Sequence, residues 1–193
     1  MRIVVALAMV AALAPAQPPR RNMTPAILKG PSDWRFESMP TPPEFAPDIA
    51  LKGFEEARFA PGMFDNTSAD YLTYVFVISA DGAPNLDSAA LKDFLEKYYR
   101  GLSVGVGRQK GLSPDPAQMV AEVTAEGRDR MTARMGFIDS FTDGRKVMLN
   151  IEARVVPRPA AKKTGVILLI SPQPKDHAVW QRLRAIGGAI AFD

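Results

Sequence analysis

The feature that most constrains the fold is a long stretch, Arg130 to Val156, in which apolar and polar residues alternate. The apolar members are Met131, Ala133, Met135 and Phe137 in its first half, and Val147, Leu149, Ile151, Ala153 and Val155 in its second. A period of two places one row of side chains in a core and the other row outside it. Between the halves, Thr142-Asp143-Gly144-Arg145 contains an Asp-Gly pair, which tolerates the positive φ of a tight turn. The stretch therefore predicts a β-hairpin.

Shorter patterns predict the elements around this hairpin. We expect strands over 51–59, 70–79, 118–126 and 166–170, and helices over 88–102 and 177–192. Asp87 and Asp176 are the expected N-caps of the two helices, and the glycines at 101, 105 and 107 are expected to end the first helix.

The order of these elements indicates the fold class. Strands and helices do not alternate as parallel βαβ winding requires, and four consecutive strands between residues 118 and 171 favour a meander. The strand over 70–79 is apolar on both faces, which is typical of a central strand. The sequence predicts an α+β fold, with a mostly antiparallel sheet of about six strands and two covering helices.

Residues 1–16 have the layout of a secretory signal peptide. Arg2 precedes an apolar run from Ile3 to Ala14, and small residues at Ala14 and Ala16 suit cleavage after either one. The run is shorter than the about 20 residues of a membrane span, and it has no amphipathic face that would suit a buried helix. We expect a secreted or periplasmic protein with no membrane insertion after cleavage.

A proline-rich segment, residues 17–47, is expected to form an arm on a single α+β domain over 48–193. Its Trp34, Phe36 and Phe45 are costly to leave in water, so we expect them to pin the arm to the domain. The alternative is an aromatic platform for a peptide or a sugar.

The composition bounds the possible functions. There is no cysteine, so the stability of an exported domain must come from its core rather than from disulfides. The 24 basic and 21 acidic residues give a net charge of +3, and nucleic-acid binding is not predicted because it requires a clustered basic face. With one histidine and no cysteine, neither a metal site nor a cofactor is predicted.

The glycine-rich stretch 100–111 is the nearest feature to a phosphate loop. A phosphate loop follows a strand and opens a helix, whereas this stretch closes one. We take Trp34, Arg100, Arg108 and Lys110 as the candidate ligand-binding residues. The alternative for the three cations is a favourable position near the negative end of a helix.

Catalytic residues cannot be assigned from the sequence. The only histidine, His177, is accompanied by no Gly-x-Ser-x-Gly motif. Glu55 and Glu56 are neighbours on one strand and therefore point to opposite faces. An acid–base site would have to gather residues from separate strands, such as Glu55, Asp139 and His177.

The polar face of the hairpin carries Arg130, Arg134, Glu152 and Arg154. We expect these residues to form cross-strand ion pairs.

Three segments resemble a group of uncharacterised secreted bacterial proteins of unknown function. They are Trp34-Arg35-Phe36-Glu37, residues 42–47 (Pro-Pro-Glu-Phe-Ala-Pro) and residues 53–64, and the helix end Tyr98-Tyr99-Arg100-Gly101-Leu102 is also similar. This resemblance implies export from a bacterium and no known activity. Separately, the element order is similar to the Mog1/PsbP-like α/β/α sandwich.

These observations lead to two functional hypotheses. The first is an exported soluble envelope protein that binds an envelope protein or a small ligand without catalysis. The second is a hydrolase or lyase with acid–base residues gathered from separate strands.

Overall fold

The computed structural model describes residues 27–192, so the expected signal peptide and the first part of the arm lie outside it. These residues contain seven strands: β1 (Arg35–Thr41), β2 (Gly53–Phe59), β3 (Tyr74–Asp81), β4 (Ala121–Ala125), β5 (Arg130–Ile138), β6 (Lys146–Arg158) and β7 (Lys163–Ser171). The helices are α1 (Ser88–Gln109) and α2 (Val179–Ala189), with short 3-10 turns η1 (Pro116–Gln118) and η2 (Pro159–Ala161). No helix within this range is both long and apolar enough to cross a membrane.

The strands form one sheet in the order β1-β2-β3-β7-β6-β5-β4, and every neighbouring pair is antiparallel. The predicted α+β class with a mostly antiparallel sheet and two helices is confirmed. The strand beyond the expected six is β1, from the proline-rich segment. Pro40 lies within it. A proline is tolerated there because β1 is an edge strand, on which one row of N–H groups has no ladder partner to lose.

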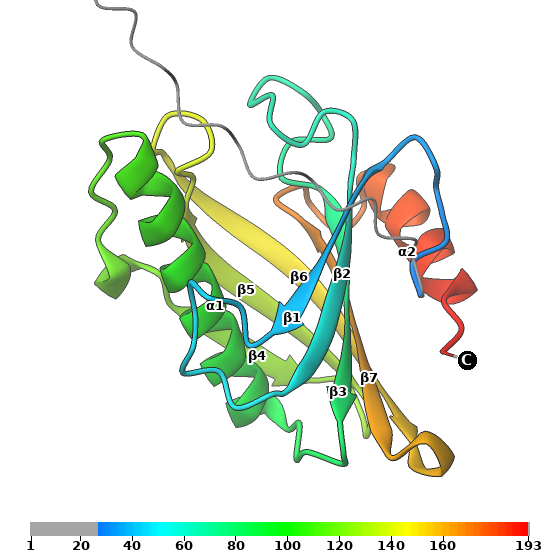
Figure 1. The fold of residues 1–193 in the computed structure, drawn as a ribbon. Helices are drawn as coiled ribbons and strands as arrows, with labels where there is room; N and C mark the ends of the chain where they lie inside the picture. The colour runs from blue at the N-terminus through cyan, green and yellow to red at the C-terminus, as the bar shows by residue number, and fades with distance from the viewer. Residues whose placement is uncertain (1–26, 193) are drawn as a thin grey trace, which may run out of the picture.

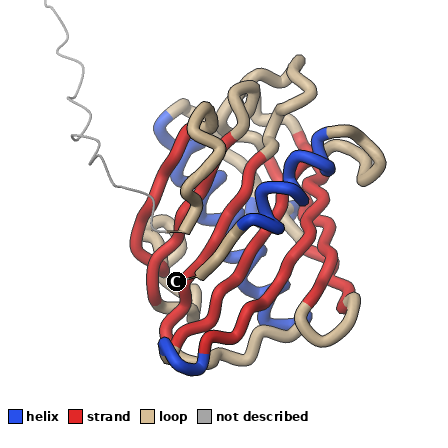
Figure 2. The backbone as a smooth tube through the Cα atoms, turned by 90° about the vertical axis from the view of Figure 1, so that its right-hand side faces the viewer, coloured by secondary structure: helices blue, strands red, loops and turns tan. Residues whose placement is uncertain are grey.

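The two helices cover opposite faces of the sheet (Figure 1). Figure 2 looks onto the face that carries α2, with α1 behind the sheet. Beneath α1, the helix residues Leu91, Phe94 and Leu95 pack on the inward side chains of the sheet. Beneath α2, Trp180 and Leu183 pack on β3 and β7. The sheet therefore supports two separate cores.

The predicted hairpin is confirmed as β5 and β6. Met135 is paired with Leu149 and Ala133 with Ile151, and all four side chains are buried. Gly144 has a φ of +77°, as the Asp-Gly pair predicted. β4, β5, β6 and β7 are neighbours in chain order, so the expected meander is also present.

The expectation that glycines end the first helix was wrong, because α1 continues to Gln109. These glycines instead allow close packing. A Cβ on Gly101 would lie 2.1 Å from the carbonyl oxygen of Phe45, and one on Gly107 would lie 2.8 Å from Pro114 Cδ. The expected N-cap is correct, since the Asp87 side chain accepts a hydrogen bond from the Ala90 N–H at 2.9 Å.

The expected cap of the second helix was also wrong. α2 begins at Val179 rather than at His177. The Val179 N–H donates a hydrogen bond to Nδ1 of His177 at 3.2 Å, and Asp176 does not cap the helix. The helix ends at Ala189, before the expected residue 192, because Ile190 is extended. The ring of Phe192 then occupies the space above Gly165, which has no side chain to exclude it.

The register of β6 makes Leu149 and Ile151 core residues, exposed by 1% and 0%. Replacing either with alanine removes buried methyl and methylene groups and leaves a cavity. We expect Leu149→Ala and Ile151→Ala each to lower the free energy of unfolding by about 2–5 kcal/mol. Urea denaturation measures this, and unchanged midpoints in both variants would contradict the assignment.

Candidate functional site

A cavity of about 590 Å³ lies between α1 and the sheet. We call it the Glu55 cavity. Its rim includes the exposed residues Arg35, Phe64 and Lys110, whereas its inner end includes Phe76 and Leu149, which are 3% and 1% exposed. It is therefore a recess that reaches from the surface into the inner core.

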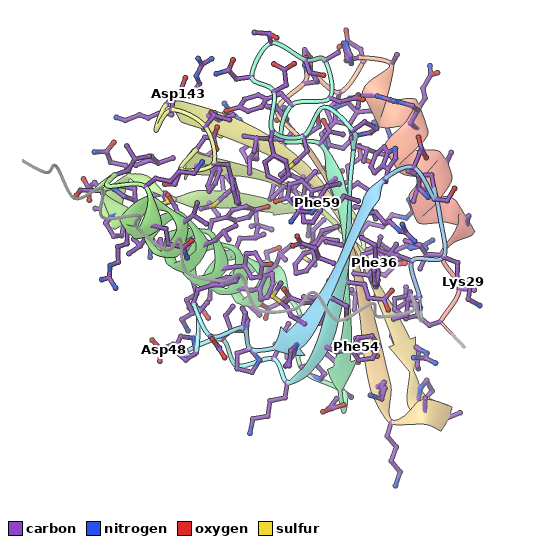
Figure 3. The ribbon with its side chains drawn as sticks, turned by 45° about the horizontal axis from the view of Figure 1, so that its top comes forward. Lys29, Phe36, Asp48, Phe54, Phe59 and Asp143 are labelled. Carbon is purple, nitrogen blue, oxygen red and sulfur yellow. The ribbon has the colours of Figure 1, made fainter. Side chains whose placement is uncertain are left out.

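Aromatic rings form much of its wall. They are Phe45, Phe59, Phe64, Tyr74, Phe76, Tyr98, Tyr99, Phe137 and Phe141, and Figure 3 shows the crowded side chains of this layer, with Phe59 labelled. Neighbouring rings pack edge to face: the ring centroids of Phe45 and Tyr98 are 5.1 Å apart, and those of Tyr99 and Phe137 are 5.5 Å apart. The wall is consequently apolar and held by ring–ring packing.

One buried carboxyl interrupts this wall. Glu55 lies on β2, is 2% exposed, and points to the α1 side of the sheet. Its carboxyl accepts hydrogen bonds from the Tyr98 hydroxyl at 2.9 Å and from Thr41 Oγ1 at 2.9 Å. Within residues 27–192 it forms no ion pair. Among the described residues, the Glu55 carboxyl is therefore bound by two neutral hydrogen-bond donors and by no cation.

Burial raises the pKa of Glu55 from 4.5 to about 7, and the hydrogen bonds from Tyr98 and Thr41 oppose the shift only in part. Desolvation disfavours the charged form because the surrounding rings cannot replace water. Near neutral pH the carboxyl is consequently present in both protonation states. It can accept a proton, donate one, or bind a cation.

Two further tyrosines add polar groups to the inner end. The hydroxyls of Tyr74 and Tyr99 are hydrogen-bonded to each other. Burial raises the pKa of both tyrosines, and also that of Tyr98, well above the usual range. All three hydroxyls therefore remain protonated at neutral pH, so they can donate hydrogen bonds.

The neighbouring Glu56 points to the opposite face, as the alternation of β2 predicted, and there it fastens the arm. Its Oε2 accepts hydrogen bonds from the N–H groups of Ile27 and Leu28, at 3.0 and 2.7 Å. Arg58 donates to the carbonyl oxygens of Leu28 and Trp34, at 3.1 and 2.9 Å. The arm is thereby held along the edge of the sheet, where β1 supplies Thr41 as a hydrogen-bond donor to Glu55.

The structure separates the four residues that the sequence singled out as ligand-binding candidates. Trp34 is 4% exposed and belongs to the core on the α2 side. Arg100 donates to the carbonyl oxygens of Pro116 and Met119, and Arg108 is exposed in the last turn of α1. Lys110 alone among the four lines the Glu55 cavity, and its ammonium donates to the carbonyl oxygen of Phe141.

The three acid–base candidates are also separated. Asp139 is fully buried, and its carboxylate accepts hydrogen bonds from the Tyr71 hydroxyl at 2.6 Å and the Phe141 N–H at 2.8 Å. His177 lies at the start of α2, on the other face of the sheet, where its Nδ1 accepts a hydrogen bond from the Val179 N–H. Glu55 is the only one of the three that lines the cavity. Asp139 and His177 thus hold a loop and a helix end.

Sequence reasoning missed Thr41, Tyr74, Tyr98 and Tyr99 as parts of a site. Tyr98 and Tyr99 were interpreted only as helix residues and Tyr74 only as a strand residue, because nothing in the chain order links them to Glu55. A usable pattern was present in β2, where Glu55 occupies an inward position beside Ile78 of the largely apolar β3. A glutamate at such a position needs donors from another element.

Comparison with known proteins identified no relative of this chain. No family model, curated protein or solved structure matches the chain. Between residues 27 and 192, no group of three or more His, Cys, Asp or Glu side chains could hold a metal ion.

The raised pKa of Glu55 predicts a specific dependence of stability on pH. Between about pH 4.5 and pH 7 the folded state binds more protons than the unfolded state, so the free energy of unfolding falls as pH rises. The full shift corresponds to about 3 kcal/mol. Glu55→Gln removes this titration but keeps an acceptor for Tyr98 and Thr41. The stability of the variant relative to wild type should therefore rise across this window by about 3 kcal/mol.

Urea denaturation at pH values on both sides of the window measures this difference. Glu122→Gln is the matched control, because Glu122 is exposed on β4 and its replacement should change stability by much less. A difference between Glu55→Gln and wild type that stays constant with pH would contradict the assignment.

Proposed function

We propose that this protein is an exported envelope module that binds a small, mostly apolar ligand in the Glu55 cavity without transforming it. The observation that carries the proposal is a buried carboxyl with no cationic partner in the described chain, set in an aromatic wall. A cavity of about 590 Å³ is in the range of small-molecule sites, which are mostly apolar with a few placed polar groups.

The chemistry of the wall favours a ligand that carries a protonated amine. A cation near Glu55 would supply the charge partner that the carboxyl lacks and would offset the unfavourable burial of its ionised form. The surrounding rings attract cations through their negative faces. An anionic ligand would instead meet the Glu55 charge without water to screen it. A hydroxyl donor would gain one hydrogen bond but no charge attraction.

Two broader parts of the proposal rest on the sequence. Export is supported by the layout of residues 1–16. The likeness to a Mog1/PsbP-like sandwich is supported by the late meander, the closing helix, and helices on both faces of the sheet. Fold likeness carries no function by itself.

The alternative is a hydrolase or lyase that uses Glu55 as a proton donor or acceptor. A pKa of about 7 suits that role. The binding role is preferred because Asp139 and His177, the partners considered for such chemistry, do not line the cavity.

Three probes with the same phenethyl or benzyl body test the proposal: phenethylamine, phenethyl alcohol and phenylacetate. Isothermal titration calorimetry at neutral pH should give the tightest binding for the amine and the weakest for the carboxylate. Glu55→Gln should weaken binding of the amine by about tenfold, because a charge-assisted hydrogen bond is lost. Val106→Phe, at a partly exposed position of the cavity lining on α1, should weaken all three probes.

Glu122→Gln serves as the control and should bind all three probes as wild type does. Equal affinity of Glu55→Gln and wild type for the amine would overturn the proposed role of Glu55. Native mass spectrometry of protein from its producing cells then identifies the natural occupant. A bound mixture of a compound with its hydrolysed or eliminated product would favour the enzyme alternative.

A further inference from the structure

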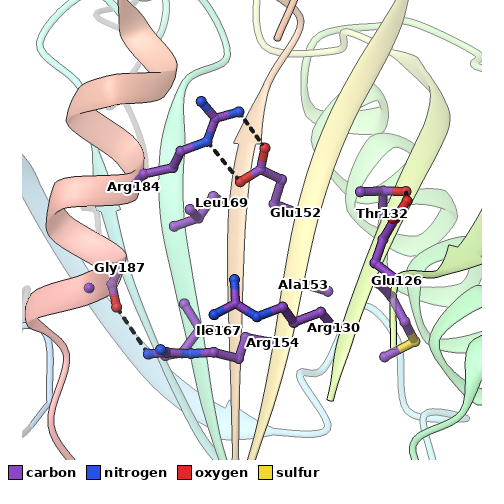
Figure 4. A pocket seen from close by; sticks show the side chains of 12 residues that line it. Glu126, Arg130, Thr132, Glu152, Ala153, Arg154, Ile167, Leu169, Arg184 and Gly187 are labelled. Carbon is purple, nitrogen blue, oxygen red and sulfur yellow. Dashed lines mark hydrogen bonds and ion pairs between the residues drawn. The ribbon is translucent and has the colours of Figure 1, made fainter. Parts of the chain in front are cut away.

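A second cavity lies on the other face of the sheet, in a groove between α2 and strands β5 and β6 (Figure 4). Its volume is about 550 Å³. Ile167 and Leu169 of β7 form an apolar floor, and Gly187 and Gly188 of α2 form part of one wall. A Cβ on Gly188 would meet no atom within 4 Å, so there is open space beside the helix at that point. We call this recess the arginine groove.

Two arginines face each other across its strands. Arg130 of β5 is directly paired with Arg154 of β6 in the antiparallel register. The expected cross-strand ion pairs of the hairpin are therefore wrong, because this register places Glu152 opposite Thr132 and Arg134 opposite Asn150. Like charges directly opposite each other on an antiparallel pair are destabilising. The free protein thus carries a local repulsion in the groove.

The acidic residues of the groove do not relieve this repulsion. Glu152 is bound by Arg184 at 2.7 Å and by Lys175 at 3.3 Å. The carboxylate of Glu126 accepts a hydrogen bond from Thr132 Oγ1 at 3.0 Å. Neither carboxylate forms an ion pair with Arg130 or Arg154 within residues 27–192. The two arginines therefore have no acidic partner among the described residues of the groove.

The Arg154 side chain is already positioned for such a partner. One of its amino groups donates to the carbonyl oxygen of Gly187 at 3.1 Å, which fixes the guanidinium between β6 and α2 (Figure 4). The Arg130 guanidinium is exposed and makes no hydrogen bond or ion pair with the described residues. Most of the ten N–H groups that two guanidiniums carry are consequently free to donate.

We propose that the arginine groove binds a phosphate group, held between Arg130 and Arg154. The planar guanidinium matches pairs of phosphate oxygens, and two of them supply the charge that a dianion requires. The apolar floor would lie beside any organic part of a phosphate ester. The site lies on the opposite face from Glu55, so it does not depend on the function proposed above.

The test compares melting temperatures of the protein in phosphate-free buffer and in the same buffer with inorganic phosphate, at matched ionic strength. Phosphate should raise the melting temperature of wild type, and Arg130→Gln should weaken phosphate binding by about tenfold or more. The matched control is Arg134→Gln. Arg134 lies four residues further along β5 and on the same face, and its replacement should leave the response to phosphate as in wild type. Phenyl phosphate in place of inorganic phosphate should bind more tightly than phosphate alone if the apolar floor contributes.

A second readout separates this role from a structural one. Without phosphate, Arg130→Gln should be at least as stable as wild type, because the repulsion with Arg154 is removed. A loss of stability in that buffer, or an unchanged phosphate response, would overturn the proposal. An equal loss of response in Arg134→Gln would also overturn it, since it would indicate general charge attraction. Arg154→Gln should reproduce the loss of phosphate binding, although it also loses its bond to Gly187.

Discussion

The antiparallel pairing of β3 with β7 is the interaction on which both faces of the structure depend. Val77 is paired with Ile167 and Ile78 with Val166, and all four are buried. One row of side chains on this pair packs under α1 and the other under α2. Because the same two strands support both cores, α1 and α2 are tied to one scaffold although they never pack on each other. The Glu55 cavity and the arginine groove consequently lie on opposite faces of a single sheet.

The outer strands are held by more specific contacts. Beyond β3, the order of the sheet is completed by β2 and then by β1, which belongs to the proline-rich arm. Glu56 and Arg58 bind backbone groups of the arm on the α2 side. Those contacts fix the edge strand whose Thr41 bonds to Glu55 on the α1 side. A loss of the arm would therefore open the cavity and remove one of the two donors to its carboxyl.

The sequence predicted the parts of this fold that follow from local periodicity. The hairpin, the meander and both helices were found because their apolar spacing is regular over many residues. β1 was missed since the prolines of the arm argue against a strand, and only its edge position makes Pro40 acceptable. The length of α1 was underestimated because the close approach of Phe45 to Gly101 is a tertiary contact. The Glu55 cavity was missed for the same reason, since its polar groups come from β1, β2, β3 and α1.

The two glutamates of β2 show how a structural carboxylate differs from a functional candidate. Glu56 is buried beside Arg58 and accepts two backbone hydrogen bonds. Burial lowers the pKa of Arg58, and the charge of Glu56 opposes that shift only in part. Glu55 is equally buried, at 2% exposure, yet it meets only neutral donors, and its pKa is raised to about 7. An apolar side chain in its place would avoid this penalty above neutral pH. The proposed ligand rests on this contrast, because a carboxyl without a charge partner lines a cavity large enough for a small molecule.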